Sequence, residues 1–230
     1  MSEPRNDLIA RLPRLDRARL LAACQPVTLG MGETLWQRGD ITSYAYFPVR
    51  AYVSMLTRID AHPSLEVGLV GNEGMVGLHL LLGIRAALLQ ALVQGPGLAW
   101  RIGAVAFKRE LSVSPPLQQL LQRYLYVRLA QQANAAGCLR FHMIGPRLAR
   151  WLLMTQDRAH SDSFQMTHEF LASMLGVRRV GVTAAAGAMQ RAGLIRYHRG
   201  DIQVLDRPGL EAAACSCYAS ERASLEDFLD

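Results

Sequence analysis

Between residues 27 and 102 the hydrophobic positions come in short runs separated by glycine or polar turns. The runs are VTL before Gly30, TLWQ before Arg38, YAYFPV, YVSMLTRI, SLEVGLV before Gly71, LLQALVQ before Gly95, and LAWRI. Many short strands at regular spacing, with turn residues between them, predict an antiparallel barrel or jelly roll. Strands do not alternate with helices around a glycine-rich phosphate loop, which argues against a nucleotide-hydrolysing α/β fold.

The segments on either side follow a helical period. Residues 5–24 carry leucine and isoleucine at helical spacing, interrupted by Pro13. Ser114 can cap a later helix that has prolines in its first turn. Along that helix, apolar residues keep the a/d spacing of a coiled coil before the seam turns polar. The residues at this spacing are Leu117, Leu120, Tyr124 and Val127. Together with Leu121 they predict either a dimer interface or packing of the helix on the barrel of the same chain.

Residues 166–200 change the pattern again. Apolar positions up to Leu175 form one face of a short helix that Thr167 can cap, and Gly176 ends it. A second helix opens at Arg178 and Arg179 and ends at Gly193. Residues 194–205 then form two short strands around Arg199-Gly200-Asp201, a turn whose glycine can adopt positive φ. Helix, glycine turn, helix and hairpin is the order of a winged helix-turn-helix.

Arginine at the start of the second helix suits contact with DNA. In a helix-turn-helix the first residues of this helix meet base edges in the major groove. Arg179 is the candidate for base readout, because arginine can donate two hydrogen bonds to guanine. Other side chains nearby suit phosphates or line the groove. The further candidates are Thr167, His168, Arg178, Val182, Thr183, His198 and Arg199.

Charge points to the same region. The chain has a formal net charge of +6 at pH 7, and residues 141–200 hold eight arginines against three acidic residues. Positive charge concentrated in one segment is typical of a polyanion partner, although charge alone does not separate DNA from RNA or a membrane surface. The chain has no apolar run long enough to cross a bilayer and no signal-peptide core, so we expect a cytoplasmic protein without a membrane partner.

With these motifs the chain resembles the Crp/Fnr superfamily of bacterial transcription regulators, the group of the cyclic-AMP receptor protein. MLGVRR, GAMQRAGLIRYHRG and the late CSCY resemble a branch whose effectors are not established. The resemblance implies an α+β protein with a cyclic-nucleotide-binding-like jelly roll, a dimerisation helix with a hinge, and a winged helix-turn-helix with a tail. These occupy residues 1–113, 114–140 and 141–230. It implies double-stranded DNA, a second copy of the chain and RNA polymerase as partners, with the hinge between Gly137 and Pro146.

The resemblance also places an effector cassette at residues 71–77. There Glu73 would accept from a ribose hydroxyl, and glycine amides would approach a phosphate. The family's cyclic-nucleotide binders then carry an arginine followed by a hydroxyl residue. Here Arg85 comes slightly early and neither serine nor threonine follows it, so a buried cyclic phosphate would lack full compensation. Cyclic AMP or cyclic GMP, a more apolar ligand, and a purely structural turn stay open. The pocket candidates are Gly71, Glu73, Gly74, Met75, Arg85 and Gln90.

The remaining chemistry is sparse. Four cysteines, at 24, 138, 215 and 217, are too few and too irregular for a disulfide framework. Cys215 and Cys217 alone lack the ligands of a structural metal or an iron–sulfur cluster, so neither is expected. No nucleophile elbow or paired carboxylates are found, so we expect no enzyme. The competing class is a cyclic-nucleotide-type sensor that regulates a protein partner without specific DNA binding; the basic second helix favours the DNA-binding interpretation.

Overall fold

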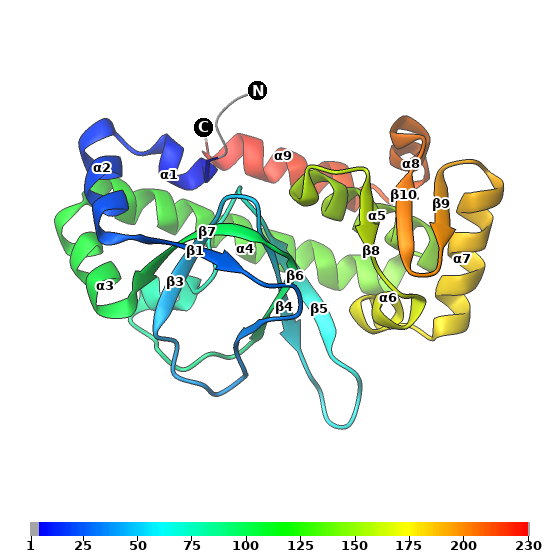
Figure 1. Ribbon diagram of the computed structural model, residues 1–230, viewed down its shortest axis with the longest axis horizontal. Coiled ribbons are helices and arrows are strands. Elements are labelled where there is room, and N and C mark those ends of the chain that lie inside the picture. Colours follow the sequence, from blue (N-terminus) through cyan, green and yellow to red (C-terminus); the bar gives the residue numbers. More distant parts are fainter. Residues whose placement is uncertain (1–4, 230) are drawn as a thin grey trace. The chain divides into compact units, whose positions relative to one another are not determined.

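The computed structural model describes the backbone of residues 5–229 and the side chains up to residue 227. It divides into two compact units. Unit 1 consists of the chain up to residue 57, residues 68–130, and the chain from 225 onward; unit 2 consists of residues 58–67 and 131–224. Figure 1 labels the elements of both. Among the helices of the described residues, none combines the length and the apolar character needed to span a bilayer.

Unit 1 contains the antiparallel strands that the short hydrophobic runs predict. One sheet has the order β1-β7-β3, and the other has the order β2-β6-β4-β5. The pairs β1–β7, β3–β7, β2–β6 and β4–β6 are antiparallel. The strands are β1 (Gln25–Leu29), β2 (Thr34–Trp36), β3 (Tyr44–Pro48), β4 (Tyr52–Thr57), β5 (Leu65–Val70), β6 (Gln90–Gly95) and β7 (Gly97–Gly103). The first three residues of β5 belong to unit 2.

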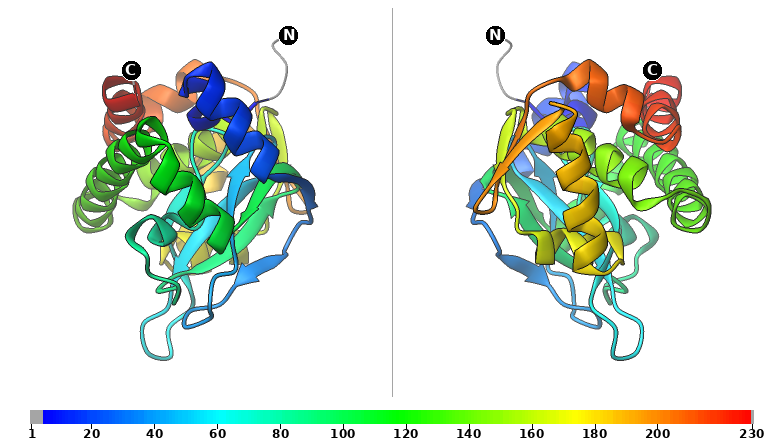
Figure 2. Two further views of the ribbon diagram at one scale, coloured as in Figure 1. Left: turned by 90° about the vertical axis from the view of Figure 1, so that its left-hand side faces the viewer. Right: turned by 90° about the vertical axis from the view of Figure 1, so that its right-hand side faces the viewer.

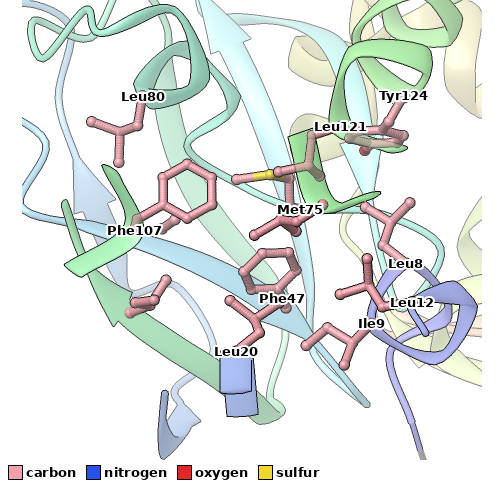
Figure 3. Packing of buried hydrophobic residues seen from close by; sticks show 13 residues of the cluster. Leu8, Ile9, Leu12, Leu20, Phe47, Met75, Leu80, Phe107, Leu121 and Tyr124 are labelled. Atoms are coloured by element: carbon pink, nitrogen blue, oxygen red, sulfur yellow. The ribbon is translucent and has the colours of Figure 1, made fainter. Parts of the chain in front are cut away.

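Short helices complete the core of unit 1. The expected break at Pro13 is present, because this residue separates two helices and forms the N-cap of the second. Phe47 and Phe107 meet edge to face with ring centroids 6.5 Å apart. Figure 3 shows Met75 pointing among Phe47, Phe107 and Leu121, so strand, loop and helix residues share one core. The helices are α1 (Asp7–Arg11), α2 (Arg14–Ala23), α3 (Ala104–Val113) and the 3-10 helix η1 (Leu78–Leu82).

The long helix α4 (Pro115–Phe141) begins as predicted, since the Leu117 amide donates to Ser114 Oγ over 3.3 Å. Its apolar seam was also proposed as a dimer interface, and that prediction was wrong. The barrel needs an apolar helix face to close its core, and the seam supplies it. The residues buried in their own chain are Leu117, Leu121, Tyr124 and Val127, and Leu120 packs against the same core.

The expected hinge is shorter than predicted. Gly137 lies inside α4, and the helix continues to Phe141. Only His142 and Met143 separate it from α5 (Ile144–Ala159). The chain therefore has one two-residue interruption here instead of an extended flexible segment.

Unit 2 combines two central helices with a small sheet of order β8-β10-β9. Strand β8 was not predicted, because three residues carry too short a pattern. Residues 58–67 also belong to this unit: Ser173 Oγ donates to the Ser64 carbonyl over 2.8 Å, and Trp151 Nε1 donates to Glu66 over 2.9 Å. Besides α5, the elements are β8 (Ser163–Gln165), α6 (His168–Leu175), α7 (Arg179–Arg191), β9 (Ile195–His198), β10 (Asp201–Val204), α8 (Arg207–Ala213) and α9 (Cys217–Leu229), which continues into unit 1.

Candidate nucleic-acid interface

The turn between α6 and α7 is built by local interactions. Thr167 caps α6, and its Oγ1 accepts from the Phe170 amide over 3.1 Å. Gly176 ends the helix in the left-handed conformation with φ of 62°. A Cβ at this position would also lie 2.8 Å from the end of the Leu65 side chain, which would have to shift, but it is the positive φ that favours glycine. These contacts confirm the predicted cap and turn.

Helix α7 exposes its first two arginines and buries the opposite stripe. Arg178 is the N-cap and Arg179 is the first helical residue, and both side chains are exposed. Val182 is fully buried, at 0% exposure, together with Ala186 and Met189. Our inclusion of Val182 among the DNA contacts was therefore wrong, because the i, i+4, i+7 stripe packs on the neighbouring helices instead.

The exposed face of α7 includes a residue that the sequence reasoning missed. Val180 is 73% exposed, and Thr183 and Ala184 lie exposed one turn further along. The helical period could have found Val180, since it lies two positions before Val182 and so on a different face. The exposed face thus presents arginines at its start and small or apolar side chains behind them, which suits thymine methyl groups.

His168 is the first residue of α6, and its side chain contacts residues of α7 and of the wing. Its Nδ1 lies 3.0 Å from Thr183 Oγ1 on α7, and its ring stacks on Tyr197 of β9. Partial burial, assisted by the charge of Arg179, lowers the pKa of His168 below its ordinary value of 6.5. The imidazole is therefore neutral at neutral pH, and its contacts suit positioning better than pairing with a phosphate.

The hairpin β9–β10 is the predicted wing, and Figure 2 (right) shows it beside α7. Arg199 and Gly200 both have positive φ, 48° and 90°, as the two central residues of a type I′ turn require. His198 and Arg199 are exposed at its tip, as proposed. The Tyr197 amide donates to Gln190 Oε1 of α7 over 2.8 Å, which ties the wing to this helix.

The surface charge of unit 2 is smaller than the count of arginines suggested. Arg147 and Arg158 are buried, and Arg150 points inward, where it binds Glu221 over 2.6 Å. Arg158 also lies 3.8 Å from Glu221. Buried arginines of this kind are not available to attract a polyanion. The exposed arginines that remain are Arg178, Arg179, Arg191, Arg196 and Arg199.

The predicted effector cassette forms a well-supported loop. Both carboxylate oxygens of Glu73 accept from the Gly71 amide, over 3.1 and 3.0 Å. Asn6 Nδ2 donates to the Gly74 carbonyl over 2.8 Å. A Cβ on Gly74 would lie 2.1 Å from the Tyr124 hydroxyl, so this glycine allows α4 to approach the loop. Glu73 therefore already has a structural role in holding the turn.

The other cassette candidates lie in different surroundings. Met75 is buried in the hydrophobic core of unit 1, and its assignment to a ligand pocket stays a prediction. Arg85 is exposed between η1 and β6, where its carbonyl accepts from the Thr42 amide over 2.8 Å. Gln90 is half-buried at the start of β6, opposite Leu56. The core takes Met75 because an unbranched apolar side chain fills it well.

The sequence of this chain is similar to those of known transcription regulators. Residues 146–213 match the Crp-like helix-turn-helix domain. The chain is 24% identical over 185 residues to the global nitrogen regulator of Synechococcus elongatus, covering 76% of this chain and 83% of that protein. The matched helix-turn-helix segment contains α6, α7 and the wing in the order described above.

Solved structures share the fold. FixK2 from Bradyrhizobium japonicum superimposes with a TM-score of 0.70 at 14% identity, over 84% of this chain and 98% of that one. A transcriptional regulator of the Crp/Fnr family from Thermus thermophilus gives a TM-score of 0.67 at 23% identity, over 83% and 98%. Together, the matched domain and the curated relative support a DNA-binding transcription regulator with a nucleotide-binding-like domain before its helix-turn-helix, and the solved structures show that its fold is similar to that of Crp/Fnr regulators.

Proposed function

We propose that the chain acts as a homodimer that places two α7 helices in successive major grooves of an inverted-repeat DNA site. The observation that carries this proposal is the exposed face of α7, with Arg178 and Arg179 at its start. Arg179 reads a guanine, while Arg178 and the wing residue Arg199 contact phosphates. Thr183 and Val180 extend the contact along the groove.

A second face of α4 supports the dimer. Tyr126 and Leu129 are 58% and 60% exposed, on the side of the helix away from the buried seam. The exposed positions continue at heptad spacing, which is the pattern of a helix pair. Alanines later in the stripe allow two helices to approach closely. The proposed interface consists of Gln122, Tyr126, Leu129, Ala133 and Ala136.

Regulation would pass along the chain segments that connect the two units. Helix α4 runs from unit 1 into unit 2, because its residues up to 130 belong to the first and those from 131 onward to the second. A signal in the barrel would shift the balance between states that do and do not present the two α7 helices at the spacing of one DNA turn. Contact with RNA polymerase would convert binding into altered transcription.

Fluorescence anisotropy on the DNA upstream of the protein's own gene tests this proposal. Random DNA of equal length, measured at the same salt concentration, is the matched control. Preferential binding to the upstream DNA, with a stoichiometry of two chains per site, supports the proposal. Equal affinity for both DNAs, or binding of one chain per site, contradicts it.

The same titration in the presence of cyclic AMP or cyclic GMP tests whether the barrel binds a cyclic nucleotide that changes the affinity for DNA. Because Glu73 is engaged by Gly71 and Arg85 lies exposed, we expect DNA binding to be unchanged by either nucleotide. Tighter binding with a nucleotide would show that the altered cassette still holds a cyclic phosphate.

A further inference from the structure

Four potential metal ligands meet in unit 2. Cys138 lies in the last turn of α4 and His142 directly follows that helix, while Cys215 precedes α9 and Cys217 is its first residue. Their ligand atoms all lie within 4.8 Å of one another. Cys138 Sγ is 3.6 Å from Cys215 Sγ, and Cys217 Sγ is 3.5 Å from His142 Nδ1.

Local structure explains how each pair presents its side chains. Cys138 and His142 are four residues apart, and the His142 amide donates to the Cys138 carbonyl over 3.1 Å. Helical geometry therefore puts both side chains on one face. The Cys215 amide donates to the Pro146 carbonyl over 3.3 Å, which holds the Cys-x-Cys turn against the start of α5.

We propose that Cys138, His142, Cys215 and Cys217 bind one zinc ion in tetrahedral geometry. Zinc bonds to thiolate sulfur at about 2.3 Å, so ligand atoms on a regular tetrahedron lie about 3.8 Å apart. The two measured pairs, 3.6 and 3.5 Å, match that separation. Three cysteines with one histidine are a common ligand set of structural zinc sites, which have no open position.

The spacing favours a single ion over an iron–sulfur cluster. In a [4Fe–4S] cluster each protein ligand binds its own iron, and in a [2Fe–2S] cluster the ligands form two pairs on two irons, so a set of four spans a longer distance than it does around one ion. Here the four ligand atoms are close enough to share one centre. Cys138 and Cys215 are buried, while His142 and Cys217 are half-buried, so an ion can enter from the side of the latter pair.

The surroundings compensate the charge of the proposed site. Three thiolates and a divalent ion leave one net negative charge. Arg150 Nη1 lies 4.0 Å from Cys138 Sγ, and its other terminal nitrogen binds Glu221. Cys217 is the first residue of α9, where the positive end of the helix dipole favours a thiolate.

The four ligands lie at the two ends of the helix-turn-helix domain, which indicates a structural role for the bound ion. Cys138 and His142 precede the segment 146–213 that matches the Crp-like helix-turn-helix domain, and Cys215 and Cys217 follow it directly. One ion would therefore join the two ends of this domain. Because metal binding to a folded site adds to the free energy of folding, zinc would keep the ends of the domain together when DNA is bound or released.

Metal analysis of the purified full-length chain tests the proposal. After dialysis, zinc is measured by plasma mass spectrometry for the wild type, Cys217→Ser and His142→Ala, with Cys24→Ser as the matched cysteine control in unit 1. We expect one zinc per chain in the wild type and in Cys24→Ser, and near-complete loss in the other two. Circular dichroism verifies that each variant is folded.

Cobalt substitution provides a spectroscopic readout independent of DNA binding. The zinc-free, reduced wild type should show the thiolate-to-cobalt charge transfer and intense ligand-field absorption of a tetrahedral site when Co²⁺ is added, and equimolar Zn²⁺ should displace it. Folded Cys217→Ser should give a weaker, shifted spectrum. The proposal is overturned if the folded, reduced chain binds neither ion, or if Cys138 and Cys215 are recovered as a disulfide under the same reducing conditions.

Discussion

The imidazole of His168 stacks on the phenol ring of Tyr197, with ring centroids 4.0 Å apart and planes 15° from parallel. The same imidazole contacts Thr183 on α7 through Nδ1. One side chain therefore joins the start of α6, the exposed face of α7 and the wing. Aromatic pairs of this kind contribute about 0.5–1.5 kcal/mol beyond the area that they bury.

This contact predicts a pH dependence of stability. The pKa of His168 is lowered in the folded chain, so the unfolded chain binds this proton more readily below pH 6.5. Stability should therefore fall as pH decreases through the window just below 6.5, and His168→Gln should lessen that fall. Thermal denaturation at a series of pH values measures it. Burial also lowers the pKa of His79, so this residue contributes to the same pH dependence. The variant His79→Gln is therefore measured for comparison. An unchanged slope in His168→Gln would contradict the prediction.

Arg179→Ala should weaken binding to the preferred DNA site by about 1–3 kcal/mol and relax the preference at one base pair. The reason is that a bidentate contact with guanine is lost while the phosphate contacts remain. Anisotropy on a set of single-base variants of the site measures both effects. Arg14→Ala, an exposed arginine in unit 1, is the control and should bind as the wild type does. Equal losses on specific and random DNA would make Arg179 a phosphate contact.

Two valines on α7 should behave in opposite ways. Val182→Ala should lower the free energy of unfolding by about 1–3 kcal/mol, because it leaves a cavity in the domain core. Val180→Ala should change stability by less than about 0.5 kcal/mol and weaken specific DNA binding instead. Urea denaturation and anisotropy on the same two variants separate the effects. A reversal of the two outcomes would show that α7 is rotated about its axis relative to this structure.

The exposed stripe of α4 predicts which change separates the dimer. Leu129→Asp should shift the chain toward monomer, since burying a carboxylate in a helix pair is costly. Analytical ultracentrifugation measures the shift, and the folded monomer should lose most of its affinity for an inverted-repeat site. Leu15→Asp, at a position that is 78% exposed on α2, serves as the control. An unaltered dimer in Leu129→Asp would place the interface elsewhere.

Elements that depend on neighbouring residues could be predicted from the sequence. Thr167 caps α6, Gly176 ends it, and Arg199-Gly200 turns the wing, as expected. Each of these features depends on hydrogen bonds and backbone angles within a few residues. The strands of the barrel were predictable for the same reason, because their alternation and turn residues are local.

The sequence by itself therefore determined the strand-rich region before the long helix, the helix-turn-helix with its wing, and the arginines at the start of α7. Only the tertiary structure decided which apolar face of α4 closes the barrel, because that helix has apolar residues on both faces. It also decided which arginines are buried, and that Val182 faces the core. Cys138 and Cys215 lie 77 residues apart in sequence, and their proximity follows from the packing of whole helices. Contacts between distant segments depend on the sum of many packing interactions, which no short pattern contains.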